Sequence, residues 1–248
     1  MKTHHEFLDP ICCATNLDSF GLRKAILESV RDQLANFSGT LLDIGCGNMP
    51  YKTLLFAPPS RVQNYIGLDL HGSIPKPDLE WDGQTIPLPD DSVDHCLATE
   101  VLEHVPDPEK VLREAWRVLK PVGRILFTAP FLWPLHCIPN DHCRYTPFSL
   151  ERHLSRAGFE QIQLKSLGGW DASLAQMIGL WTMHRPMSSL KRTILSRAAL
   201  PAVRYLMQRD QPPSVFKEGL YMITGISGTA LKPAATGNKA EKEGDAFR

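Results

Sequence analysis

The sequence has no excess of charge of either sign and no long apolar run. Its 248 residues carry 27 Lys and Arg against 27 Asp and Glu, so the overall charge does not point to nucleic acid. No apolar stretch approaches the roughly 18 residues that a membrane span requires. The first residues, MKTHHEFLDPICC, lack the apolar core of a secretory signal. We therefore expect a cytoplasmic protein without a nucleic-acid partner; its oligomeric state stays open.

Cysteine is too sparse and too scattered for a disulfide framework. The chain has only six cysteines over its full length, whereas small disulfide-stapled domains use them densely. Internal repeats are also lacking. A hydrophobic content of 43% is ordinary for a globular core. The length fits one large domain, or one domain with an appendage.

Predicted strands alternate with predicted helices along most of the chain. Apolar spacing predicts a helix over residues 19–37, and Asp107 followed by Pro108 predicts the N-cap and first position of another. Short apolar runs predict strands at residues 41–45, 65–70, 92–99, 124–131, 159–166 and 221–232. This alternation predicts an α/β fold with a doubly wound parallel sheet.

The chain divides into five predicted parts. They are an N-terminal arm (1–18), a core (19–167), a helical insertion (168–215), a last core strand (216–232) and a tail (233–248). The tail, PAATGNKAEKEGDAFR, is polar and is predicted to be disordered.

The insertion is basic and apolar. Residues 172–209 contain no Asp or Glu but six Lys or Arg. Such a segment could face an anionic membrane surface or a phosphorylated or lipid-linked substrate. However, the charges from Lys191 to Arg197 do not segregate on a helical wheel. A helical subdomain over the active site, or a dimer contact, is the alternative.

A glycine-rich turn follows the first predicted strand. Asp43, Gly45 and Gly47 give the pattern D-x-G-x-G, and glycines let a backbone approach a ligand closely. The dinucleotide fingerprint needs a third glycine at its sixth position, which here is Pro50. A nicotinamide-dependent dehydrogenase is therefore disfavoured.

Further segments follow this turn in a recognisable order. Asp69 ends the second predicted strand, Asp82 lies in WDGQTIPLPDDSVD, and residues 99–131 read TEVLEHVPDPEKVLREAWRVLKPVGRILFTAPF. Over roughly residues 20–165 the chain resembles the class I S-adenosylmethionine-dependent methyltransferases, specifically the type-11, UbiE-like group. The resemblance implies a Rossmann-like, seven-stranded, mostly parallel sheet with an antiparallel last strand. It also implies an enzyme that uses S-adenosylmethionine to methylate a small-molecule acceptor. We expect transfer to oxygen, with sugar- or glycan-related acceptors as candidates.

The resemblance assigns roles to individual residues. Asp69 would hold the ribose hydroxyls and Asp82 the adenine amino group, with Leu70 packed on the adenine. The complete set of predicted cofactor-binding residues is Asp43, Gly45, Cys46, Gly47, Asp69, Leu70, Asp82, Gly83, Thr99 and Glu100. A protein that binds the cofactor for regulation or scaffolding, without catalysis, is the alternative.

The stretch after the predicted strand 124–131 resembles a motif of one methyltransferase subgroup, H-x-x-P-x-D-x-x-R-Y-T-P. His136 is the predicted catalytic base, since an imidazole titrates near neutral pH. Asp141, Arg144 and Tyr145 are the predicted substrate-binding residues. Alternatively, Arg144 only braces the loop by pairing with Asp141.

Two clusters resemble metal sites, and we expect no metal at either. His136-Cys137 and His142-Cys143 are adjacent pairs, whereas metal ligands usually stand two or more residues apart. Glu100, Glu103 and His104 form E-x-x-E-H. A few relatives use such a cluster for a divalent ion; the alternative is that Glu103 and His104 orient the following turn.

Overall fold

The computed structural model describes residues 6–217 and 219–234 of the chain. Its strands are β1 (Ser38–Ile44), β2 (Arg61–Leu70), β3 (Leu79–Trp81), β4 (Val93–Thr99), β5 (Leu119–Pro130), β6 (Glu160–Ser166) and β7 (Gly225–Leu231). Its helices are α2 (Phe20–Gln33), α3 (Lys52–Leu55), α4 (Pro108–Val118), α5 (Pro147–Arg156), α6 (Trp170–His184) and α7 (Ser189–Arg209). Two short 3₁₀ turns, η1 (Leu34–Asn36) and η2 (Leu102–His104), follow α2 and β4.

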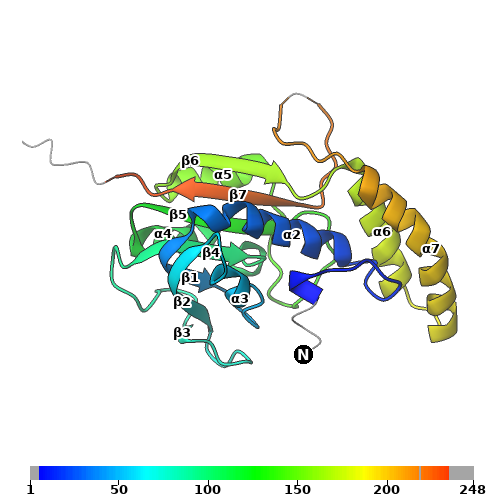
Figure 1. The fold of residues 1–248 in the computed structure, drawn as a ribbon, viewed down its shortest axis with the longest axis horizontal. Helices are drawn as coiled ribbons and strands as arrows, with labels where there is room; N and C mark the ends of the chain where they lie inside the picture. Colours follow the sequence, from blue (N-terminus) through cyan, green and yellow to red (C-terminus); the bar gives the residue numbers. More distant parts are fainter. Residues whose placement is uncertain (1–5, 218, 235–248) are drawn as a thin grey trace, which may run out of the picture.

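All seven strands belong to one sheet, in the order β3-β2-β1-β4-β5-β7-β6 (Figure 1). The strands from β3 to β5 pair in parallel. β7 lies between β5 and β6 and runs antiparallel to both. The predicted fold class is confirmed: the sheet is seven-stranded and mostly parallel, with an antiparallel last strand.

Helices cover both faces of the sheet, as doubly wound topology requires. One core packs α2 and α3 on the sheet through residues such as Leu27, Leu41 and Leu55. The other packs α4 and α5 on the opposite face. Successive residues of a strand point to opposite faces, so β1 sends Leu41 to the first core and Leu42 to the second. The carboxyl ends of the parallel strands meet at one edge, where open α/β sheets place their ligands.

Several element boundaries differ from the sequence prediction. β1 starts at Ser38 and β2 at Arg61, ahead of the predicted 41 and 65. β3 was not predicted, because three residues are too few for a periodic pattern. The predicted helix over 19–37 ends at Gln33 and continues as η1. The predicted strand over 221–232 begins only at Gly225. β5 starts at Leu119, ahead of the predicted 124. The start of α4 is confirmed, since the Asp107 carboxylate accepts a hydrogen bond from Lys110 N and Pro108 is the first helical residue.

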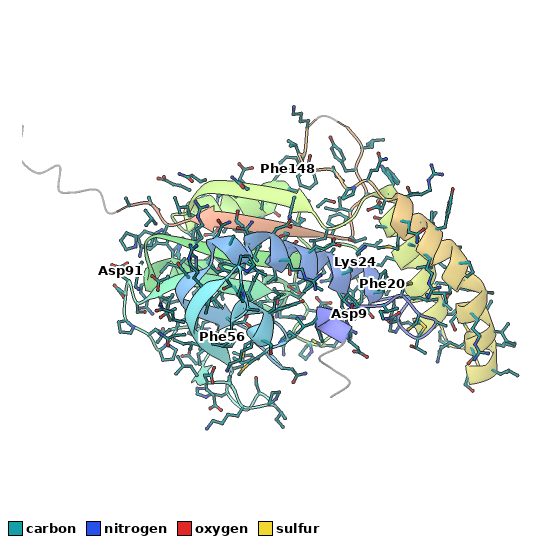
Figure 2. All side chains as sticks on the ribbon, viewed as in Figure 1. Asp9, Phe20, Lys24, Phe56, Asp91 and Phe148 are labelled. Atoms are coloured by element: carbon teal, nitrogen blue, oxygen red, sulfur yellow. The ribbon has the colours of Figure 1, made fainter. Side chains whose placement is uncertain are left out.

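The insertion folds as a helical hairpin of α6 and α7 that extends beyond one end of the sheet (Figure 1). Its base packs on the N-terminal arm through Cys12, Leu17, Ala175 and Val203. Phe20, at the start of α2, packs against the same cluster (Figure 2). The arm therefore joins the hairpin to the core.

Within the described residues, no helix has the length and apolar character needed to cross a bilayer. The predicted tail lies outside the described residues, apart from 233–234. The five-part division of the chain stays a prediction.

Candidate active site

The glycine turn after β1 lies at the carboxyl edge of the sheet. Gly45 and Gly47 have φ of 67° and 48°, which glycine adopts at no steric cost. A Cβ on Gly45 would lie 2.5 Å from Val101 Cγ2, whereas one on Gly47 would meet nothing within 4 Å. Gly45 is thus required for close packing, and Gly47 only for its backbone angles. Met49 also adopts a left-handed φ of 51°.

A pocket of about 630 Å³ opens beside this turn. Its walls come from the carboxyl ends of β1, β2, β3 and β4, the start of α4, and the loop after β5. Six predicted cofactor-binding residues line it: Gly45, Asp69, Leu70, Asp82, Gly83 and Glu100. The side chains come from segments far apart in sequence and converge on one cavity.

Two aspartates on this wall are held by backbone N–H groups. Asp69 accepts hydrogen bonds from Gly47 N at 2.9 Å and from Leu70 N at 2.7 Å. Asp82 accepts from Gln84 N and Thr85 N, both at Oδ1. These bonds from Thr85 and Gln84 hold the pKa of Asp82 below its ordinary value. Both carboxylates are therefore fixed in place by backbone donors at the pocket wall.

Four other predicted cofactor residues do not line the pocket. Asp43 is buried and accepts a short hydrogen bond from the Tyr65 hydroxyl. Burial raises the pKa of Asp43 to about 7. Cys46 is buried, and burial raises the pKa of its thiol to about 12. Thr99 and Gly47 lie in segments next to lining residues. Their cofactor contacts stay a prediction; for Asp43 and Cys46, the burial favours a supporting role.

Two glutamates follow β4 in unusual environments. Glu100 has φ of 54°, lines the pocket and accepts a hydrogen bond from Thr128 Oγ1 at 2.8 Å. Burial raises its pKa to about 7. Glu103 has no exposed surface, and neither carboxylate oxygen has a hydrogen-bond partner within the described residues. Burial, and then the charge of Glu100, raises the pKa of Glu103 to about 9. Burial therefore favours the neutral form of Glu103, whose Oε1 lies 3.6 Å from His104 Nε2.

The loop after β5 is built around a buried ion pair. Asp141 has a side chain only 2% exposed and accepts from both terminal nitrogens of Arg144, at 2.6 and 2.9 Å. Arg144 also donates to the carbonyl oxygens of Trp133, Pro134 and Cys143. The His136 backbone N–H donates to Asp141 as well. The terminal nitrogens of Arg144 therefore all donate hydrogen bonds within the loop. This favours the alternative in which Arg144 and Asp141 brace the loop rather than bind substrate.

Turn η2 ties this loop to the pocket. His104 Nδ1 lies 2.7 Å from Asn140 O and donates to it, while the Glu103 carbonyl accepts from His142 N at 2.8 Å. The Tyr145 hydroxyl donates to Leu102 O at 2.8 Å, and Tyr145 is buried. This contact favours a structural role for Tyr145, and its predicted contact with substrate stays a prediction.

His136, the predicted base, stands behind the pocket wall. Its side chain is half-buried, with Nδ1 3.3 Å from Asp141 Oδ2 and its ring 4.7 Å from the ring of His104. Both His104 and the neighbouring Cys137 line the pocket. The sulfur of Cys137 and ring nitrogens of the two histidines lie within 4.8 Å of one another. This grouping differs from both clusters considered from sequence, because it takes one member from η2 and two from the loop.

The structure adds lining residues that sequence reasoning missed. Trp81 comes from the unpredicted β3, Val101 closes over Gly45, and Lys110 comes from the first turn of α4. Asn140 and His142 come from the loop after β5, where they occupy unspecified positions of its motif. Only the fold brings these side chains to the cavity; no spacing in the sequence marks them.

Residues 42–127 match the family described as Methyltransferase domain. The UbiE ubiquinone/menaquinone biosynthesis C-methyltransferase of Vibrio campbellii is 31% identical over 137 residues, covering 43% of this chain and 49% of that protein. A chloroplastic 2-methyl-6-phytyl-1,4-hydroquinone methyltransferase of Spinacia oleracea is 32% identical over 95 residues, which cover 36% of this chain and 27% of that protein. The match spans less than half the length of either relative.

A solved structure has the same fold. It is a SAM-dependent methyltransferase from Archaeoglobus fulgidus, which superposes with a TM-score of 0.53 and covers 85% of this chain and 93% of its own. Its sequence is 18% identical, so this likeness concerns the fold alone.

Proposed function

We propose that this chain, whose residues 42–127 match the family described as Methyltransferase domain, is an S-adenosylmethionine-dependent enzyme that methylates a small-molecule acceptor. The observation that carries the proposal is the single cavity lined by Gly45, Asp69 and Asp82 on one side and by the loop after β5 on the other. One wall suits a nucleoside, and the other is formed by a different segment that can receive an acceptor.

The residues present fit the family's cofactor. Without a Cβ, Gly45 lets Val101 close over the turn, and the two backbone-held aspartates offer acceptors for ribose hydroxyls and an adenine amino group. Leu70 is half exposed and lies 3.4 Å from the position of a Cβ on Gly83, so both can contact a flat ring. When bound, S-adenosylmethionine supplies a methyl group already activated by its sulfonium.

The protein's own contribution is to place an acceptor behind that methyl group and to remove its proton. Alignment of this kind can lower a barrier by about 7–11 kcal/mol. We propose an oxygen acceptor, because an oxygen nucleophile gains roughly 10²–10⁴ in rate from a positioned base. His136, oriented by Asp141, is the base. Sugar- or glycan-related compounds are the first acceptors to test, on the resemblance of the loop motif.

The relatives do not identify the acceptor. The family match ends at residue 127, before the loop that runs from Phe131 to Pro147. The matched segment contains the residues that we propose bind the cofactor. For this reason the acceptor assignment rests on the loop alone.

A screen with isotopically labelled methyl donor tests the proposal. The full chain is incubated with pools of hydroxylated metabolites, and labelled products are identified by mass spectrometry. We expect both a labelled product and demethylated cofactor. Cofactor that binds by calorimetry, yet is never turned over with any pool, would favour the alternative of a catalytically inactive regulatory or scaffold protein. Failure of the cofactor and its demethylated form to bind at millimolar concentration would refute both.

A further inference from the structure

Helix α6 exposes one continuous apolar stripe. Trp170, Leu174, Met177 and Trp181 recur at helical spacing, and 61% of Trp170 and 47% of Trp181 are exposed. The opposite side of α6 is buried, for example at Ala175 and Gly179. This helix thus has apolar residues on two opposite sides, and only one of these sides packs on the protein. A helix of this kind normally has a second surface to bury.

Helix α7 carries a matching stripe. Leu190, Ile194 and Tyr205 fall on one side of the helix at 3.6 residues per turn, and 69% of Leu190 and 59% of Ile194 are exposed. Ser196 and Val203, which are buried, lie on the other side. The two exposed stripes therefore both point away from the packed sides of their helices.

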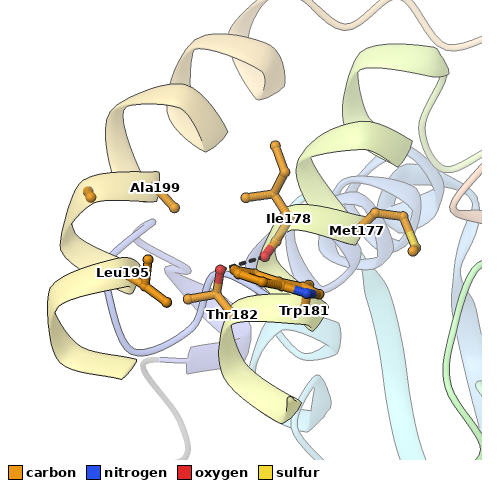
Figure 3. Close-up of a pocket in the computed structure, with 7 residues that line it drawn as sticks. Met177, Ile178, Trp181, Thr182, Leu195 and Ala199 are labelled. Atoms are coloured by element: carbon orange, nitrogen blue, oxygen red, sulfur yellow. Dashed lines mark hydrogen bonds between the residues drawn. The ribbon is translucent and has the colours of Figure 1, made fainter. Parts of the chain in front are cut away.

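A groove of about 530 Å³ joins the two stripes. Met177 and Trp181 line it from α6, and Leu195 and Ala198 line it from α7. Figure 3 shows Ile178 and Thr182 of α6 on the side of the groove that faces Leu195 and Ala199 of α7. The exposed stripes and this groove form one surface, which we call the hairpin face. Apolar patches of this extent mark interaction sites.

Basic side chains border the hairpin face. On the wheel of α7, Lys191 and Arg209 follow one edge of its stripe, and Arg197 and Arg204 follow the other. Two guanidinium groups stack on exposed aromatic rings: Arg185 lies 5.1 Å from the Trp181 ring centre, and Arg209 lies 5.4 Å from that of Tyr205. The charges fail to segregate to one side because they flank the apolar stripe on both sides.

The charge of this region contrasts with the rest of the protein. Residues 172–209 hold six Lys or Arg and no Asp or Glu, which leaves 21 basic against 27 acidic residues elsewhere in the chain. Two copies meeting through this face would bring like charges together. An apolar surface with tryptophans and flanking Lys and Arg is instead complementary to the interfacial region of an anionic membrane.

We propose that the hairpin face docks on an anionic lipid bilayer. Trp170 and Trp181 would enter the headgroup region, where tryptophan is enriched, and the flanking Lys and Arg would contact lipid phosphates. The hairpin also touches the acceptor loop, because Gln176 Nε2 donates a hydrogen bond to Leu132 O. Docking would therefore bring the acceptor side of the pocket close to the membrane.

Vesicle flotation with the full chain tests this proposal without any methyl donor, so its outcome is independent of the proposed activity. We expect the chain to float with phosphatidylcholine vesicles that contain phosphatidylglycerol, and less so as salt is raised. It should not float with phosphatidylcholine alone. The double variant Lys191→Glu, Arg197→Glu should lower the partition coefficient at least about tenfold, since each basic residue contributes roughly fivefold. The double variant Trp181→Ser, Ile194→Ser should lower it to a similar extent.

Matched controls come from α5, where Phe148 and Arg152 are exposed. Phe148→Ser and Arg152→Glu should leave flotation unchanged. All replaced side chains are exposed, and melting curves confirm that each variant is folded. Brominated acyl chains should quench wild-type fluorescence more strongly than that of Trp170→Phe, Trp181→Phe. Unchanged flotation of both hairpin variants, or equal flotation with neutral vesicles, overturns the proposal. A dimer in sedimentation that Trp181→Ser, Ile194→Ser dissociates, without lipid binding, would show that the face is a self-interface instead.

Discussion

Breaking the ion pair between Asp141 and Arg144 should destabilise the whole protein, because the pair is the structural centre of the loop after β5. Asp141→Asn would leave the Arg144 charge unpaired. Breaking a buried pair from one side costs about 3–5 kcal/mol. The Arg144 side chain is 23% exposed and keeps its hydrogen bonds to carbonyl oxygens. We therefore expect a loss of unfolding free energy at the lower end of this range, about 3 kcal/mol. For a chain of this length that corresponds to a fall in Tm of about 6–12 °C.

Urea unfolding, followed by circular dichroism, measures this loss in a double-mutant cycle. Asp141→Asn combined with Arg144→Met should cost less than the sum of the single changes, with a coupling energy above about 1 kcal/mol. The control is Arg113→Met, whose partner Glu109 lies at 3.4 Å on the surface. Losing an exposed pair of this kind should cost less than about 1 kcal/mol.

The pH dependence adds a second test of the same pair. The Arg144 guanidinium holds the pKa of Asp141 well below its ordinary 3.8. The stabilisation is therefore complete above that value and is lost as pH falls through the lowered pKa. If Asp141→Asn costs no more than Arg113→Met while the acceptor KM rises, the pair contacts substrate and the bracing role is refuted.

Three further predictions concern the pocket. Burial raises the pKa of Glu103 to about 9, against an ordinary 4.5, so the free energy of unfolding should fall as pH rises between these values. Glu103→Gln should flatten this pH dependence, measured by urea unfolding at several pH values. An unchanged slope would show that Glu103 is ionised in the folded protein. Gly45→Ala should weaken cofactor binding in calorimetry more than Gly47→Ala does. Both variants carry the roughly 1–2 kcal/mol of strain of a left-handed residue, but only the Cβ at residue 45 also meets Val101, at 2.5 Å; equal losses of affinity would contradict the steric argument. His136→Ala should lower the methyl-transfer rate about 10²–10⁴-fold, while cofactor affinity stays within about threefold, or roughly 0.7 kcal/mol. A parallel loss of cofactor affinity would show that His136 does not act on the acceptor side of the pocket.

Local signals in the sequence predicted those elements that local physics controls. Asp107 and Pro108 marked the start of α4 because an N-cap carboxylate and a proline both act within one turn. β1 appeared as a continuous apolar run because a parallel strand between two helical layers is buried on both faces. β3 stayed hidden, since its three residues form a strand only by pairing with the end of β2. The late start of β7 likewise depends on its pairing with β5, from Gly225 opposite Pro130.

In the candidate site, too, some residues could be found from sequence, whereas the roles of others are visible only in the fold. The glycine turn and Asp69 could be found from sequence, because they stand at the ends of predicted strands whose carboxyl ends must reach the same edge of the sheet. Asp82 follows the unpredicted β3 and was found through the family resemblance. The loop after β5 could be located, but the roles within it could not. Its motif does not reveal that the terminal nitrogens of Arg144 donate hydrogen bonds within the loop, or that Tyr145 is buried.

What the sequence by itself determined is the alternation of strands and helices, the fold class and the residues that we propose bind a nucleoside. Those features depend on side-chain periodicity and on residues a few positions apart. Only the tertiary structure decided that the Glu103 carboxylate is enclosed with no hydrogen-bond partner among the described residues, that His104 from η2 meets His136 and Cys137, and that the hairpin has two exposed sides forming one face. Each of these depends on contacts between segments far apart in sequence, and the burial that sets their pKa values and exposure exists only once those segments are packed.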